Sequence, residues 1–218
     1  MSSLPNIAAA RRRLSESEQD KHGVVVIYVY NNNKVGFPHA TDWTGGVQPF
    51  KIYGILPGAD FGAGVAVSDD ALTVAVGSPE RSVENGTMNR TGMVQVYQYA
   101  DGSWNQKGAD ILPDGDNIFL FGYRVGLSQD GNSLAVSAPN SSHPSQGQVG
   151  ALFVFDWDSR NESWIPAVLA KYGSTSDQHL GVKGIVTDPQ NLLLHAVDID
   201  DNRHSFKVRC TVILSNLS

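Results

Sequence analysis

The sequence contains a single cysteine, Cys210, and no run of apolar residues long enough to form a membrane-spanning helix. One cysteine excludes an internal disulfide, so we expect packing alone to hold the fold together. The first 22 residues also lack the apolar segment of a secretory signal. From this absence we expect either a protein made in the cytosol or an internal piece of a longer chain.

Charge is also scarce, since Asp, Glu, Lys and Arg make up 17% of the 218 residues, and the net charge is −6. A negative chain argues against nucleic-acid binding, because neutralising phosphates requires a basic surface. The one basic run, residues 11–13, lies among few large apolar residues, and we interpret residues 1–22 as a flexible tail. Glycine is abundant, at 22 residues, which predicts many tight turns.

A repeat with a spacing of 60 residues organises the chain. Segment 61–79 returns without a gap as segment 121–139, with identical residues at eight of nineteen positions. Each copy begins with Phe-Gly, at Phe61 and Phe121, and a weaker copy begins with Leu180. We expect both phenylalanines to be buried at equivalent positions, because a repeated large apolar residue indicates a repeated core contact.

A second block recurs in phase with the first. It starts with glycine, continues with apolar and aromatic residues, and is found at 23–30, 92–99 and 150–157. A tryptophan follows each block, at Trp43, Trp104 and Trp164. The alternation within these blocks is typical of β-strands.

Each repeat predicts four antiparallel strands, with sheets over residues 61–112 and 121–170. A four-stranded unit cannot bury both of its faces alone, and stacking on its neighbours solves this problem in propellers. We therefore predict an all-β fold, a partial β-propeller of about three four-stranded blades with about 60 residues each. The predicted units are a tail (1–22), a half blade (23–57), two blades with the FG motif (58–119 and 120–178) and a degenerate partial blade (179–218).

The motif Phe-Gly, Ala-Val-Gly-Ser-Pro, Gly-x-Val-x-Val-Tyr and then Trp resembles the FG-GAP repeat of integrin α-like propellers, over residues 23–197. The resemblance implies a propeller that is mostly extracellular and non-enzymatic, with a role in adhesion or protein binding. Some relatives of this family are phospholipases or have carbohydrate-related roles.

Calcium loops with alternating carboxylates are common in that family, and this sequence departs from them. The corresponding segments are 69–71, 129–131 and 188–190, and none supplies the oxygen ligands that calcium needs. The acidic segment 198–202 lacks a following glycine and an acceptor glutamate, so we interpret it as a polar loop. We predict no metal site, and Asp198, Asp200 and Asp201 are the first residues to test if calcium binds.

No catalytic constellation emerges from the remaining residues. The six histidines have no metal-ligand spacing, and Ser128 recurs in the repeat as Ser68, which favours a structural role. Asp114 and Asp116 belong to an expected exposed turn. We therefore predict that the chain is not an enzyme, has no catalytic residues and binds no cofactor.

Loops 31–42, 80–91 and 140–148 vary while the strands repeat, and we expect a protein or glycan partner there. Sequons at Asn85, Asn89, Asn140, Asn161 and Asn216 are compatible with a secreted glycoprotein, although loops rich in Asn, Ser and Thr produce the same pattern. Localisation therefore stays open.

The function that we expect is a non-catalytic protein-interaction or adhesion-type propeller module. The alternative is a non-catalytic fragment of a larger propeller enzyme or carbohydrate-active protein. Because closed propellers have four to eight blades, we also expect further blades or self-association to complete the ring.

Overall fold

The structure is a computed structural model, and it describes residues 6–12, 23–30, 50–82, 90–174, 179–182, 184–188, 193–199 and 205–208. Regular structure in these ranges consists of β-strands, and no residue in them lies in a helix. No helix in this part of the chain is therefore long and apolar enough to cross a membrane. The all-β class predicted from the sequence is confirmed.

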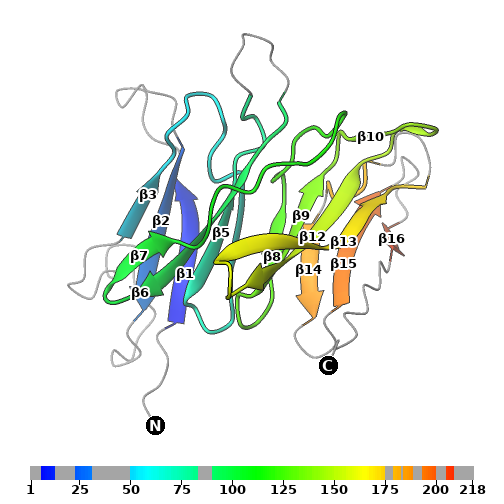
Figure 1. The fold of residues 1–218 in the computed structure, drawn as a ribbon. Coiled ribbons are helices and arrows are strands. Elements are labelled where there is room, and N and C mark those ends of the chain that lie inside the picture. Colours follow the sequence, from blue (N-terminus) through cyan, green and yellow to red (C-terminus); the bar gives the residue numbers. More distant parts are fainter. Residues whose placement is uncertain are drawn as a thin grey trace.

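Four antiparallel sheets follow one another along the chain (Figure 1). The first contains β1 (Asn6–Arg12), β2 (Val24–Tyr30) and β3 (Phe50–Tyr53) in that order. The fourth contains β14 (Gly184–Asp188), β15 (Leu193–Ile199) and β16 (Ser205–Val208). These two three-stranded sheets flank the two sheets that carry the full repeat.

The second sheet contains β4 (Gly64–Val67), β5 (Thr73–Gly77), β6 (Val94–Ala100) and β7 (Ser103–Gln106). The third contains β8 (Val125–Leu127), β9 (Ser133–Ala138), β12 (Ala151–Asp158) and β13 (Ser163–Tyr172). A small hairpin of β10 (Ser142–His143) and β11 (Gly147–Gln148) lies between β9 and β12 in the chain. The prediction of two four-stranded sheets with one topology is confirmed.

Strand β1 differs from the expectation of a flexible tail over residues 1–22. Residues 6–12 pair with β2 along their whole length, from Asn6 opposite Tyr30 to Arg12 opposite Val24. A β-ladder joins backbone groups, which this segment supplies without alternating apolar side chains. The tail interpretation is therefore wrong for residues 6–12.

Successive sheets pack face to face, and a hydrophobic core fills each space between them. Phe61 is 1% exposed in the core between the first and second sheets, and Phe121 is 0% exposed in the core between the second and third. Leu180 packs on Leu152 between the third and fourth. The buried phenylalanines are confirmed, and this stack of sheets is part of a β-propeller.

Phe61, Phe121 and Leu180 are the anchors of their interfaces, and the glycine after each anchor lets neighbouring backbones approach closely. Gly62 and Gly122 have φ angles of 87° and 90°, which glycine adopts without strain. Their amides donate to the carbonyls of Gly77 and Ser137 at 2.9 and 3.0 Å. A Cβ at Gly77 would lie only 1.9 Å from the Gly122 carbonyl oxygen, so this contact requires glycine. The FG motif therefore fixes how closely two sheets pack.

The antiparallel order also decides which connections meet. The β3–β4 connection (residues 54–63) reaches the second sheet at the start of β4. The connection from β5 to β6 (residues 78–93) begins at the same end, because Gly64 pairs with Gly77. The β7–β8 and β9–β12 connections reach the same end of the third sheet, which is the upper end in Figure 1. The short turns after β4, β6, β8 and β12 lie at the opposite end.

Candidate functional site

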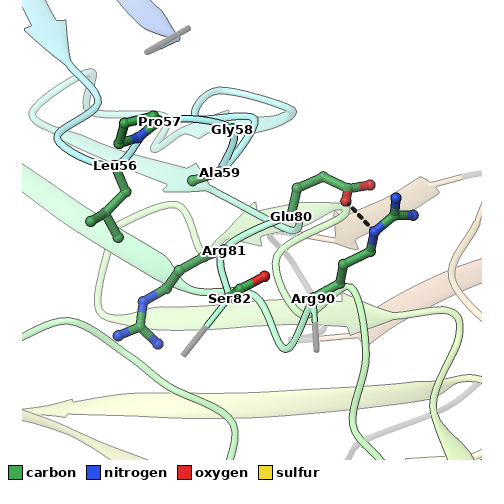
Figure 2. A pocket seen from close by; sticks show the side chains of 8 residues that line it. All are labelled: Leu56, Pro57, Gly58, Ala59, Glu80, Arg81, Ser82 and Arg90. Atoms are coloured by element: carbon green, nitrogen blue, oxygen red, sulfur yellow. Dashed lines mark ion pairs between the residues drawn. The ribbon is translucent and has the colours of Figure 1, made fainter. Parts of the chain in front are cut away.

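A pocket of about 360 Å³ lies at this upper end, where the connections before β4 and after β5 meet (Figure 2). Residues 56–59 of the first connection line it together with residues 80–82 and Arg90 of the second. The Glu80 amide donates to the Ala59 carbonyl at 3.2 Å and joins the two connections. The pocket therefore lies between two segments that are distant in sequence.

The wall formed by residues 56–59 is a tight turn. The Ala59 amide donates to the Leu56 carbonyl at 3.4 Å, and Gly58 has a φ of 72°. Proline at the second position and a glycine with positive φ at the third are typical of a type II turn. Leu56 and Pro57 thus give the pocket an apolar wall, whereas Gly58 adds no side chain.

The opposite wall carries the charges. Arg90 Nε pairs with Glu80 Oε2 at 2.9 Å, so the charge of each is balanced by the other. Arg81 has no hydrogen-bond or ion-pair partner for its side chain among the described residues, and its Nε is enclosed without an acceptor. Figure 2 shows the Arg81 side chain directed toward the side on which Leu56 lies, away from the Glu80–Arg90 pair.

The second repeat shows why this pocket is particular to the first. Ser141 occupies in the second repeat the backbone position that Arg81 has in the first. The Ser141 amide donates to the Ala138 carbonyl at 3.1 Å, and the Arg81 amide donates to the Ser78 carbonyl at 3.2 Å. Ser141 is fully buried, and its hydroxyl accepts a hydrogen bond from the Phe119 amide at 3.2 Å. The connection over residues 107–120 covers this place, and the shorter connection over residues 54–60 leaves the Arg81 side open.

Sequence reasoning placed partner contact in loop 80–91 but did not single out Arg81. The loop supplies Glu80, Arg81 and Arg90 to the pocket. Alignment of the two repeats offers a signal, because Glu80-Arg81 stands where the second repeat has Asn140-Ser141. The turn itself therefore does not require a charged residue at either position.

The aspartates of the expected hairpins stabilise turns. Asp130 Oδ1 accepts hydrogen bonds from the Ser128 hydroxyl at 2.6 Å and the Asn132 amide at 3.1 Å, and Asp70 bonds Ser68 and the Leu72 amide in the same way. Burial acts to raise the pKa of Asp130, but these hydrogen bonds outweigh it and hold the pKa below its usual value. Ser128 and Ser68 therefore have the structural role that their recurrence indicates.

None of the other described residues considered from the sequence lines the pocket. Asp198 lies in β15, and Asp200 and Asp201 fall outside the described residues. Asp114 and Asp116 are exposed in the connection before β8. Among the described residues, no group of three or more His, Cys, Asp and Glu side chains could hold a metal ion.

Two of the sequons can be placed. Asn140 follows β9 and is half-buried, and Asn161 is exposed in the turn between β12 and β13. The Asn161 amide donates to Asp158 Oδ2 at 2.7 Å. Asn85, Asn89 and Asn216 lie outside the described residues.

A buried cation lies at the contact between the second and third sheets. Lys107 Nζ donates to the Gly131 carbonyl at 2.9 Å and to Asn132 Oδ1 at 2.8 Å, and it lies over the rings of Trp157 and Trp164. Burial lowers the pKa of Lys107, although the nearby Asp130 and Asp70 carboxylates act in the opposite direction. All of its contacts are internal, so we assign Lys107 a structural role.

No protein-family model matches the sequence, and no curated protein matches it. Solved structures do match. A candidate 6-phosphogluconolactonase from Bacteroides uniformis has a TM-score of 0.50 at 15% identity, over 87% of this chain and 50% of its own. The periplasmic gluconolactonase of Pseudomonas aeruginosa has a TM-score of 0.48 at 17% identity, over 90% of this chain and 47% of its own. A candidate 6-phosphogluconolactonase from Bacteroides fragilis has a TM-score of 0.47 at 15% identity, over 95% of this chain and 56% of its own.

The likeness to the Bacteroides uniformis structure supports the propeller fold. The chain spans about half the length of the structures that it matches. The prediction that the chain is not an enzyme is contradicted, because the Bacteroides uniformis structure, whose fold the chain shares, is named as a candidate 6-phosphogluconolactonase. The reason is physical: a repeat reports the strands that build a propeller, whereas a site formed by connections that differ between blades leaves no trace in it. The resemblance to the FG-GAP repeat stays a prediction.

Proposed function

We propose that this chain is part of a propeller enzyme and that the pocket beside Arg81 binds its substrate. The observation that carries the proposal is the pocket itself, which connections unique to one repeat form at the common end of the sheets. Ligand sites are typically concave, with an apolar lining and a few polar groups, and this pocket has both. The propeller shared with the Bacteroides uniformis structure supports the enzyme-type alternative over an adhesion module.

As substrate class we propose a sugar lactone or the sugar acid that its hydrolysis produces. The names of the matching structures suggest this class, and the pocket suits it in size and in chemistry. Its volume of about 360 Å³ falls in the range of small-ligand sites. Leu56 and Pro57 offer an apolar surface to a sugar ring, and Ser82 and Arg81 offer hydrogen-bond donors.

We further propose that additional blades complete the ring, from a longer chain or from a second copy. The match to half of each similar structure supports this proposal. Tyr53 of β3 and Ile55, which follows β3, are 55% and 69% exposed, which is apolar surface that a neighbouring blade could cover. Light scattering during size-exclusion chromatography tests self-association, and a stable monomer at high concentration would leave only the longer chain.

Hydrolysis of 6-phosphogluconolactone and of gluconolactone by the full chain tests the enzyme proposal. Both compounds hydrolyse spontaneously, so the expected result is a rate above the buffer rate that rises in proportion to protein concentration. Arg81→Ala should reduce the rate, whereas Arg160→Ala, at the exposed turn between β12 and β13, should not. Rates equal to buffer for both lactones, with no binding of the product acids, would overturn the proposal.

A further inference from the structure

We propose that Arg81 is an anion-binding residue and that the ligand of the pocket carries a carboxylate or phosphate group. Only the sugar portion of this ligand rests on the proposed function. The anionic group is inferred from the charges and from the state of the Arg81 side chain.

Among the described residues that line the pocket, there is one more cation than anion. Its lining has two arginines and one glutamate, and the Glu80 carboxylate is bonded to Arg90 Nε at 2.9 Å. Arg81 is left without a counter-ion among the described residues, in a chain whose net charge is −6. An arginine that lacks a protein partner beside a pocket is suited to an anion, because its planar donors match the oxygens of carboxylates and phosphates.

The Arg81 Nε strengthens this inference. It is enclosed and has no acceptor within the part of the chain that the structure describes, although nearly all buried donors in proteins have one. In this position, solvent does not reach Nε. An anion that first meets the terminal amino groups would allow the side chain to turn and present Nε as well, which forms a two-bonded arrangement. Binding an anion thus satisfies a donor that the unliganded pocket leaves unbonded.

The second repeat shows that the turn does not need arginine. Gly92 and Gly150 amides donate to the Arg81 and Ser141 carbonyls at 3.0 and 2.9 Å, so the two residues hold the same backbone position. Serine fills this position by burying its hydroxyl, and arginine instead extends to the pocket. Arg81→Ser therefore replaces the residue with one that the fold already accepts there, and it is a matched variant for a test of binding.

Calorimetric titration of the full chain with inorganic phosphate, gluconate, 6-phosphogluconate and neutral glucose tests the site. We expect at least one of the anions to bind and Arg81→Ser to weaken that binding by at least about tenfold at an unchanged melting temperature. Arg81→Lys should retain part of the affinity, because it keeps the charge and loses the planar donors. Arg160→Ser, at the opposite end, should bind as the wild type does.

The anions distinguish the two groups: phosphate alone indicates a phosphate site, and gluconate alone a carboxylate site. Equal binding by Arg81→Ser and wild type, or binding of no anion by wild type, would overturn the proposal. Anion binding that needs Arg81, without lactone hydrolysis, would support the anion site and contradict the proposal that the chain is part of an enzyme. Lactone hydrolysis at an unchanged rate in Arg81→Ser would contradict the role of Arg81 and still support the enzyme proposal.

Discussion

Phe121 and Leu180 hold the same place in successive repeats, yet the two interfaces that they enter differ. Phe121 packs edge-on against Phe153 and Phe155, with ring centroids at 5.3 and 6.1 Å, inside the core between the second and third sheets. Among the described residues, Leu180 packs on Leu152 and the partly buried Ile185. Among the described residues, the motif therefore contributes an aromatic side chain to one interface and an aliphatic side chain to the next.

The backbone of the motif is nevertheless constant. Gly62, Gly122 and Gly181 have φ angles of 87°, 90° and 89°. The Gly92 and Gly150 positions each lie against the anchor of the following sheet, since a Cβ there would be 2.1 Å from Phe121 O and 2.4 Å from Leu180 N. Glycine thus sets the geometry of each interface, and the anchor side chain sets how much apolar area the interface buries.

The largest change in the free energy of unfolding is expected when the anchors of the two interfaces are replaced. Phe121→Ala should lower the free energy of unfolding by about 3–5 kcal/mol, because it removes a fully buried aromatic ring and leaves a cavity. Leu180→Ala should cost less, about 2–3 kcal/mol, because the buried aliphatic side chain that it removes is smaller than a phenylalanine ring. Urea titrations measure both values, and a larger loss for Leu180→Ala would contradict the difference between the interfaces.

The glycine of the tighter interface provides the next test. Gly77 corresponds to Ser137, so the interface of the third and fourth sheets has a Cβ at a position where the interface of the second and third has none. Gly77→Ala should cost about 1–3 kcal/mol by overpacking against the Gly122 carbonyl. Ser137→Ala should cost only about 1 kcal/mol, through the lost bond from the Arg124 amide. Equal melting temperatures for Gly77→Ala and wild type would show that the second interface can open to admit a Cβ.

The sequence predicted these interfaces because their requirements recur. Phe61, Phe121 and the glycines after them must satisfy the same steric conditions in each repeat, so the pattern survives between copies. Strand β1 escaped prediction because its ladder with β2 needs only backbone groups, and Asn6–Arg12 shows no apolar alternation. A Tyr-Gly pair that ends both β3 and β13, at Gly54 and Gly173, is a further recurrent signal that sequence reasoning missed.

The pocket could not be read from the repeat for the opposite reason. Arg81 is informative only because Ser141 differs from it, and one pair of copies does not tell a functional difference from a neutral one. The deciding facts are three-dimensional: Glu80 pairs with Arg90, and no described residue offers an acceptor to the Arg81 Nε. The length of the connection before β4, which leaves the pocket open, also acquires meaning only once β3 and β4 are placed.

A pH titration extends the comparison to the core between the first and second sheets, on which Tyr97 packs. Burial, followed by the Asp110 carboxylate, raises the pKa of Tyr97 from 10.0 to about 12. The unfolded chain therefore releases this proton first as the pH rises above 10, so stability should fall between pH 10 and 12.

Tyr97→Phe should remove that part of the decline in urea midpoints measured at pH 9, 10 and 11. Its hydroxyl donates to Gln95 Oε1 at 3.2 Å, and the loss of this bond should lower the midpoint at pH 9 by a small amount. A decline of the same slope in both proteins would show that Tyr97 titrates normally in the folded state.

The smallest effect is expected from calcium, which should leave the melting temperature unchanged relative to a chelator. Asp70 and Asp130 each use one carboxylate oxygen for a serine hydroxyl and a backbone amide, and a cation that needs six to eight oxygens would have to displace those donors. A micromolar site at about 1 mM calcium would add about 4 kcal/mol of stability, so the experiment is sensitive. A clear shift would contradict the assignment of both aspartates to turns if Asp130→Asn abolished it. A shift that Asp130→Asn left unchanged would instead direct attention to Asp198, Asp200 and Asp201, since turns closed by hydrogen bonds alone have no reason to respond to the metal.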